Sequence, residues 1–119
     1  MPPATTQAPE RLRASADISA VFAARRSRAG RLLVVHARGR GDAAPTRIAV
    51  VASKRVGNAV RRNRAKRLLR EAARELPWQV GHDVVLTARA ACPDAHVREV
   101  GDDLATCADA LHLVDGVAA

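Results

Sequence analysis

The chain has 119 residues, of which 48% are hydrophobic and 2% aromatic, and its formal net charge at pH 7 is +8. This length and apolar content predict one compact domain and argue against a disordered chain. Two cysteines are too few for a disulfide-stapled secreted module, and no stretch approaches the ~20 apolar residues of a membrane helix, so we expect a cytoplasmic protein with reduced thiols.

The charge is distributed unevenly along the chain. Residues 1–74 hold 18 lysines and arginines against four acidic residues, whereas residues 75–119 hold two against eight. We therefore expect two oppositely charged faces, and the basic face is strong enough to make nucleic acid the expected partner. Because Phe22 and Trp78 are the only aromatic residues, binding must depend on charge and shape more than on base stacking.

The first part of the chain predicts a lead-in, a helix and two strands. Residues 1–13 contain three prolines and read as a flexible basic N-terminal segment. Ser15 can cap a helix that runs to about residue 26, in which Ile18, Val21 and Phe22 have the spacing of one buried stripe. After a basic cluster at 25–31, the β-rich runs 31–38 and 46–53 flank a segment of turn composition, which predicts a hairpin or meander.

The second part predicts a long helix, a strand and a last helix. Asn58 is well suited to N-cap a helix that ends before Pro77, and residues 83–88 read as a strand. A helix from about 93 to 114 has one apolar seam, which consists of Val97, Val100, Leu104, Cys107, Leu111 and Val114. The order helix, two or three strands, helix, strand, helix predicts an α+β fold, an α/β sandwich in which three helices cover a small mixed sheet of about four strands.

The segment 53–75 carries nine basic residues and two acidic ones. In a helix its apolar residues share one arc, namely Ala65, Leu68, Leu69, Ala72, Ala73 and Leu76. The opposite arc holds Asn63, Arg64, Lys66, Arg67, Arg70 and Arg74, with Arg62 near the boundary. Like charges at i, i+4 repel by a few tenths of a kcal/mol per pair, and few glutamates are interspersed to relieve this. We therefore interpret the basic arc as a surface for phosphates, which arginine binds in bidentate fashion.

This segment resembles the signature of the bacterial ribonuclease P protein family. The resemblance is carried by residues 53–60 (SKRVGNAV), by Arg62-Asn63-Arg64 and by residues 66–72 (KRLLREA), with weaker similarity over 11–22 and 81–89. It implies a protein subunit that binds a catalytic RNA and the 5′ leader of precursor tRNA and assists endonucleolytic removal of that leader. It also implies that residues 14–119 form a single RNA-binding domain, with the basic helix in an unusual left-handed βαβ crossover.

The resemblance further implies two groups of site residues. Contacts to the catalytic RNA would come from Arg62, Asn63, Arg64, Lys66, Arg67 and Arg70. The cleft for the precursor-tRNA leader would include Ile18, Phe22, His36, Ser53, Lys54, Arg55 and Arg89. Family members usually carry an aromatic residue at the position of Ile18 and often at that of His36, so we expect weaker leader affinity here. No catalytic residue is expected in the protein, because the chemistry would lie in the RNA subunit with Mg²⁺ held mainly by RNA phosphates.

Several alternatives remain at this point. A structural, ribosome-associated RNA-binding protein fits the charge and size equally well, whereas a DNA regulator with a helix in the groove fits the β-rich runs poorly, so DNA is not an expected partner. A zinc quartet is superficially suggested by four residues, namely Cys92, His96, Cys107 and His112. However, Cys107 lies on the apolar seam, which favours a buried core thiol over a metal ligand. Gly57-Asn58 is either a phosphate cradle or a plain turn with a cap.

Overall fold

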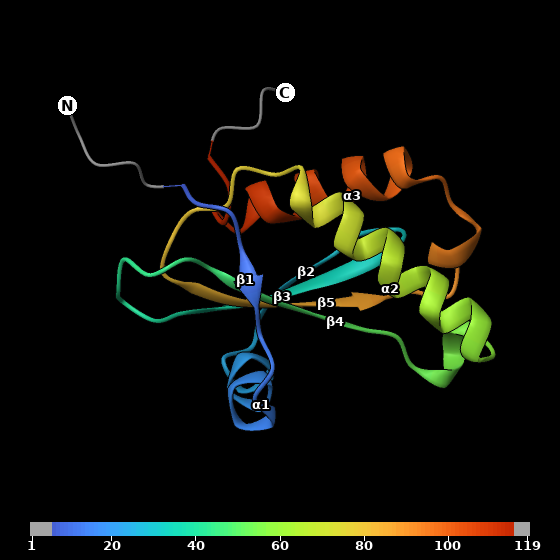
Figure 1. Cartoon of the computed structure of the whole chain (residues 1–119), viewed down its shortest axis with the longest axis horizontal. Coiled ribbons are helices and arrows are strands. Elements are labelled where there is room, and N and C mark those ends of the chain that lie inside the picture. The colour runs from blue at the N-terminus through green and yellow to red at the C-terminus, as the bar shows by residue number, and fades with distance from the viewer. Residues whose placement is uncertain (1–5, 116–119) are drawn as a thin grey trace.

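The structure is a computed structural model and describes residues 6–115. A five-stranded sheet is covered by α1 (Ser15–Ala23) on one face and by α2 (Ala59–Arg74) and α3 (Val97–Ala110) on the other (Figure 1). The strands are β1 (Glu10–Arg11), β2 (Arg26–Ala29), β3 (Leu33–Gly39), β4 (Arg47–Val51) and β5 (His82–Ala88), and two single turns of 3-10 helix are η1 (Lys54–Val56) and η2 (Cys92–Asp94). The predicted α+β sandwich is confirmed, with one more strand than expected. Within residues 6–115, no helix is long and apolar enough to cross a membrane.

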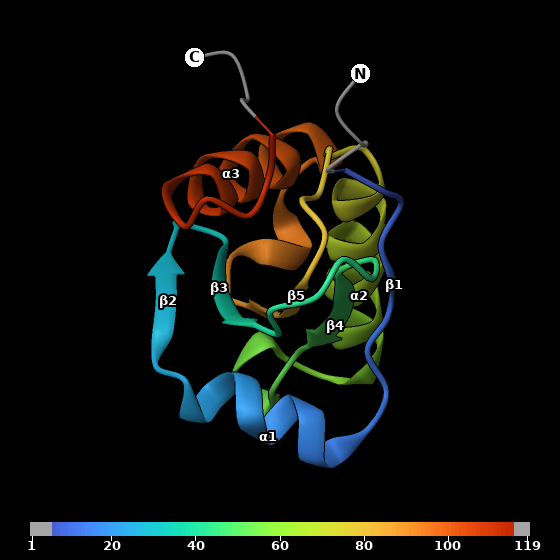
Figure 2. The ribbon, with the colours of Figure 1, turned by 90° about the vertical axis from the view of Figure 1, so that its left-hand side faces the viewer.

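The strand order is β1-β4-β5-β3-β2, and the parallel neighbours β4 and β5 are joined through α2. In Figure 1 the chain runs to the right along β4, returns to the left through α2 above the sheet, and runs to the right again along β5. Figure 2 shows that β5 lies farther from the Figure 1 viewer than β4. The path therefore turns counterclockwise as it recedes, which makes the crossover left-handed, against the usual preference.

The predicted hairpin between 31–38 and 46–53 is wrong. The strands β3 and β4 both exist, but β5 lies between them, antiparallel to β3 and parallel to β4. The run of buried residues Val84, Val85 and Leu86 is typical of a central strand with both faces covered, and this tertiary pairing outweighs the sequence proximity of β3 and β4. The actual hairpin joins β3 to β2, a strand within the segment that we interpreted as a basic cluster.

Both ends of α1 differ from the prediction. Ala14, not Ser15, is the N-cap residue, and no side chain caps this helix. The helix ends at Ala23, three residues earlier than predicted, because Arg25 has a φ of 54° and the chain enters β2 at Arg26. Residues 1–5 of the predicted lead-in lie outside the described residues, but Glu10 and Arg11 pair with β4 and Leu12 is buried. The expectation of a flexible segment is therefore wrong for residues 10–12.

The last helix begins later than predicted. Residues 92–94 form η2, and α3 starts after His96, whose side chain and Glu99 together form a capping box. The helix ends at Ala110, so Val114 is not helical but is buried in a bridge with Trp78. The middle of the predicted seam, Val100, Leu104 and Cys107, does face the core.

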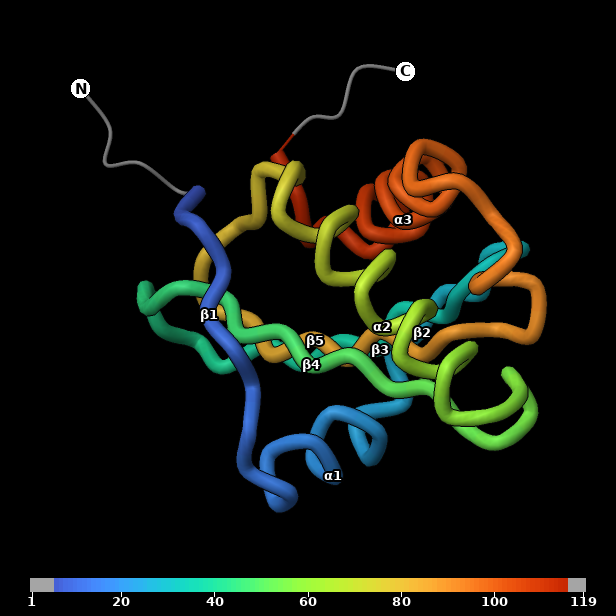
Figure 3. The backbone as a smooth tube through the Cα atoms, turned by 45° about the vertical axis from the view of Figure 1, so that its right-hand side comes forward, coloured from blue at the N-terminus to red at the C-terminus, as the bar shows by residue number. Residues whose placement is uncertain are grey.

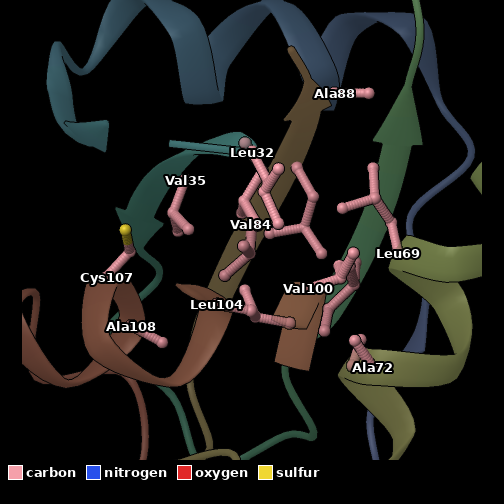
Figure 4. Packing of buried hydrophobic residues seen from close by; sticks show 14 of the residues in the cluster. Leu32, Val35, Leu69, Ala72, Val84, Ala88, Val100, Leu104, Cys107 and Ala108 are labelled. Carbon is pink, nitrogen blue, oxygen red and sulfur yellow. The ribbon is translucent and has the colours of Figure 1, made fainter. Parts of the chain in front are cut away.

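Two apolar cores lie on the two faces of the sheet. The main core fills the space between the sheet and the helices α2 and α3 (Figure 4), with Leu32, Leu69, Val84, Val100 and Leu104 among its fully buried side chains. The smaller core, under α1, consists of Leu12, Val21, Ala49 and Val85, with Ile18 and Val51 packed against it. Alternate residues of β4 and β5 therefore serve different cores.

Asp83 is the buried charge that ties the ends of three strands together. Its side chain has no exposed surface and accepts hydrogen bonds from Arg40 Nη1 (2.6 Å) and from Arg47 Nε and Nη2 (2.9 and 2.8 Å). Burial alone would raise the pKa of Asp83, but the hydrogen bonds from the two guanidinium groups outweigh it and hold that pKa below its ordinary value. Such a buried carboxylate contributes to stability only while both cations remain in place.

The variant Asp83→Asn tests this network. We expect it to lower the free energy of unfolding at pH 7 by about 3 kcal/mol, because two cations lose a buried partner. A carboxyl group whose folded pKa is lowered stabilises the fold above its unfolded pKa of about 4, and the stabilisation is lost as the pH falls through the folded pKa. The wild type should therefore lose stability below about pH 4, and the variant should lose less. Urea unfolding followed by the fluorescence of the buried Trp78 measures both, with Asp109→Asn on the surface of α3 as control. If the free energy of unfolding depended on pH equally in Asp83→Asn and in the wild type, the stabilising role of the Asp83 carboxylate would be contradicted.

The two thiols should be protected in the folded state. Cys92 and Cys107 are both buried, and burial, with a smaller contribution from Asp103, raises the pKa of Cys92 to about 11 and that of Cys107 above its usual value. An aromatic disulfide reagent at pH 8 should label neither thiol in the native protein and both in denaturant, since the thiolate is the reactive species. Rapid labelling of the native protein would contradict the packing of α3.

Candidate nucleic-acid interface

The helix α2 is positioned by its cap and its apolar face. Asn58 Oδ1 accepts a hydrogen bond from the backbone N–H of Arg61 (3.0 Å), which confirms the predicted N-cap. Within the predicted apolar arc, four residues are buried and two are partly buried: Ala65, Leu69, Ala72, Ala73, and then Leu68 and Leu76. Because this arc packs on the sheet and on α3, the charged arc must face outward.

The outward arc is a continuous cationic surface. Five of its basic side chains make no ion pair or hydrogen bond among residues 6–115, namely Arg62, Lys66, Arg67, Arg70 and Arg74. Asn63, Arg67 and Arg70 are exposed, whereas Arg62 and Lys66 are half-buried along the flank. Self-repulsion on this arc is therefore not relieved within the described part of the chain, and the arc is free to bind an external polyanion.

The N-terminal flank of α2 that faces η2 differs from the outward arc, because its arginine is bound within the protein. The guanidinium of Arg61 binds both oxygens of Asp94 (2.9 and 2.8 Å) and also donates to the carbonyl of Val56 (3.2 Å). It crosses Gly57, where a Cβ would lie 2.8 Å from Arg61 Cδ, so a glycine is required at this position. This clamp joins η1, α2 and η2, and no sequence signal indicated it because Asp94 is 33 residues away.

Arg64 belongs partly to the same clamp. Its Nε donates to the carbonyl oxygen of Pro93 (2.6 Å), so only its terminal nitrogens remain for an external ligand. The basic arc therefore has a flank fixed to η2 through Arg61 and Arg64, and an open side from Arg62 to Arg74.

Three of the predicted leader-cleft residues lie on the other face of the sheet, beside α1. The strand alternation of β3 directs His36 to this face, where its ring meets that of Phe22 edge-on with centroids 4.7 Å apart. Phe22 is 43% exposed, whereas Ile18 packs against the small core. Burial lowers the pKa of His36. The result is a partly open two-ring platform, which fits a base better than a phosphate.

The other four predicted cleft residues gather at one end of the sheet. Ser53 follows β4 and Arg89 follows β5, and the carboxyl ends of these parallel strands meet at the same edge. The 3-10 turn that carries the exposed Lys54 and Arg55 lies there too, below the first turn of α2 (Figure 3). Ser53 Oγ accepts from the backbone of Arg55 (3.3 Å), and Arg89 Nη1 donates to the carbonyl of Gly30 (2.9 Å). Within residues 6–115 no hydrogen bond or ion pair joins this basic end to the Phe22–His36 pair.

His96 and the two cysteines have roles in the fold. His96 Nδ1 accepts from the backbone of Arg98 (3.1 Å) as part of the cap of α3, and both thiols lie in the main core. The pKa of His82 is lowered, chiefly by burial and also by Arg26. Among residues 6–115 no three histidine, cysteine or acidic side chains converge to hold a metal ion.

The sheet with one strongly cationic helix on its surface defines a small basic protein of the nucleic-acid-binding class. A family model described as Ribonuclease P matches residues 7–112. The ribonuclease P protein component of Bacillus cereus strain B4264 is 36% identical over 96 residues, which cover 79% of this chain and 84% of that protein. The chain therefore belongs to the ribonuclease P protein family.

Two solved structures of RNase P proteins have the same fold as this chain. The RNase P protein from Thermotoga maritima superposes with a TM-score of 0.70 at 28% identity and covers 90% of this chain and 99% of its own. That of Staphylococcus aureus gives a TM-score of 0.74, covering 88% and 97%, and at 24% identity it supports the fold alone. These matches favour the ribonuclease P interpretation over the ribosome-associated one.

Proposed function

We propose that this chain acts in the cytoplasm as the RNA-binding subunit of ribonuclease P, binding the catalytic RNA and the 5′ leader of precursor tRNA and assisting removal of that leader. The observation that carries the proposal is the outward arc of α2 in a chain of this family, where every cation except Arg64 has no partner within residues 6–115. A polyphosphate partner removes the self-repulsion that the fold leaves in place.

The contacts to the catalytic RNA are assigned to α2. Arginine forks suit bidentate binding of phosphate, and Asn63 adds a neutral donor and acceptor. The full set is Arg62, Asn63, Arg64, Lys66, Arg67 and Arg70. The Pro93 carbonyl holds one nitrogen of Arg64, so this residue contributes to RNA binding through its remaining nitrogens and to the orientation of η2.

The leader is assigned to the face of the sheet that carries α1. Phe22 and His36 offer ring surface, with Ile18 beside them, and Ser53, Lys54, Arg55 and Arg89 offer donors and positive charge at the sheet edge. An aliphatic side chain at Ile18 gives a base less stacking surface than an aromatic ring. The cleft should therefore bind the leader by charge at one end and by limited stacking at the other.

The chemistry is assigned to the RNA. Mg²⁺ held by RNA phosphates would generate the attacking hydroxide and stabilise the leaving oxygen. The cationic surface of this chain would reduce repulsion between RNA phosphates and hold the leader, so that the scissile bond is positioned at the metal. Purified protein alone should leave precursor tRNA intact, yet it should stimulate cleavage by the RNA subunit at low Mg²⁺. Cleavage by the protein alone would overturn this assignment.

The salt dependence of RNA binding tests the α2 assignment. If about six phosphates are neutralised, the log–log slope of affinity against salt should be about −4 to −5. Arg67→Ala should reduce its magnitude by about one unit, and Arg64→Ala by less, because Arg64 is partly bound to Pro93. Arg98→Ala, an exposed arginine on α3, is the matched control. An unchanged slope in Arg67→Ala would show that this arc is not at the RNA.

Leader binding tests the ring platform. Phe22→Ala should weaken binding of precursor tRNA to the assembled holoenzyme about fivefold or more, because one stacking surface is lost. Binding of mature tRNA, which lacks the leader, should be unaffected. Ile18→Phe should strengthen the binding of precursor tRNA, because it adds a ring on which a base can stack. Equal losses for precursor and mature tRNA in Phe22→Ala would place the ring away from the leader.

A further inference from the structure

A groove of about 340 Å³ opens along the outer edge of β4, between α2 and the N-terminal segment. Its floor is apolar and is formed by residues 48–51, with Leu12 and Ile18 on the α1 side and Ala73 on the α2 side. Its charged lining consists of three arginines and one acid, namely Arg11, Arg70, Arg74 and Glu10. None of these four side chains forms an ion pair within residues 6–115.

The edge of β4 in this groove carries backbone groups that β1 does not reach. Glu10 N donates to the carbonyl of Thr46 (2.9 Å), and Leu12 N donates to that of Ile48 (2.9 Å). By the alternation of a strand, Val50 is the next residue whose N–H and C=O face outward. The pairing of β1 stops at Ile48, after which the chain turns away toward α1. Within residues 6–115 the groove therefore combines apolar walls with a backbone donor and acceptor of Val50 that have no partner.

We propose that this groove binds one unpaired nucleotide of the catalytic RNA, with its base against the edge of β4 and its flanking phosphates on Arg11, Arg70 and Arg74. The proposal rests on the proposed function and extends it to a single-nucleotide site. Arg70 belongs both to the outward arc of α2 and to the groove, so RNA lying along α2 reaches the groove without a gap.

Charge decides between the two occupants that an open strand edge accepts. A peptide strand could add to β4 through backbone hydrogen bonds. Three arginines without an ion pair among residues 6–115 surround one carboxylate and favour a ligand that brings phosphates. The apolar floor with one donor and acceptor suits the face and edge of a base. A nucleotide satisfies both conditions at once.

Photocrosslinking from the groove tests the proposal directly. In Glu10→Cys the new thiol is exposed, whereas Cys92 and Cys107 are 0% and 3% exposed, so an azidophenacyl group can be attached at position 10 alone. In the complex with the catalytic RNA we expect a crosslink to one unpaired nucleotide, mapped by primer extension. Asp109→Cys on the outer surface of α3, labelled in the same way, should give none. Replacing the mapped nucleotide by an abasic one should weaken protein binding about tenfold.

The arginines provide a second measurement. Arg11→Ala and Arg74→Ala should each weaken RNA binding about threefold to tenfold at moderate salt and reduce the salt slope by about one unit, whereas Arg98→Ala should not. Trp78 fluorescence and far-UV circular dichroism confirm that each variant is folded. Unchanged affinity in both variants would contradict the proposal.

The outcomes separate this proposal from the proposed function. Suppose the RNA binds with an Arg67-dependent salt slope, but position 10 crosslinks to no RNA, to the precursor tRNA leader, or to a second protein chain. The nucleotide site is then overturned while the function stands. If the folded protein does not bind the catalytic RNA at all, the proposed function fails and the nucleotide site fails with it.

Discussion

Everything on the RNA-facing side depends on the packing of one helix face. Seven basic residues between Arg61 and Arg74 would disfavour an isolated α2, because several of them repel at i, i+4 spacing. The helix forms because its other face buries Ala65, Leu69, Ala72 and Ala73 against the sheet and α3. The free energy of that apolar contact offsets the repulsion and holds the cations on one surface. A bound polyphosphate would then neutralise the repulsion between these cations, which the apolar packing offsets but does not remove.

The crossover sets where this cationic surface lies relative to the face on which we propose that the leader binds. Because α2 connects parallel neighbours, it must return across one face of the sheet, and the left-handed crossover places it on the face opposite α1. The proposed contacts to the catalytic RNA and the ring platform are thus on opposite faces of the sheet, and both lie next to the end of the sheet where β4 and β5 finish. Lys54, Arg55 and Arg89 lie at that end, so their positive charge is next to both proposed RNA-binding surfaces.

Local periodicity was enough to predict the parts of the structure that are local. The apolar arc of α2 and the cap at Asn58 follow from residues three to four apart, and both are confirmed. The position of β5 between β3 and β4 could not be predicted, because it depends on pairing between distant strands. The same holds for the clamp from Arg61 to Asp94 and for the ring pair, whose partners are far apart in sequence. At two residues, β1 is too short to show any periodicity, and the groove that it borders was therefore missed.

The direction of α2 has a further electrostatic consequence. Its amino end sits above the η1 turn, so the aligned peptide dipoles of the helix place roughly half a positive charge at that end of the sheet. No acidic residue occupies the first turn to cancel it. The backbone itself therefore strengthens the attraction for anions beside Lys54 and Arg55, and a part of that attraction survives the removal of any single side chain.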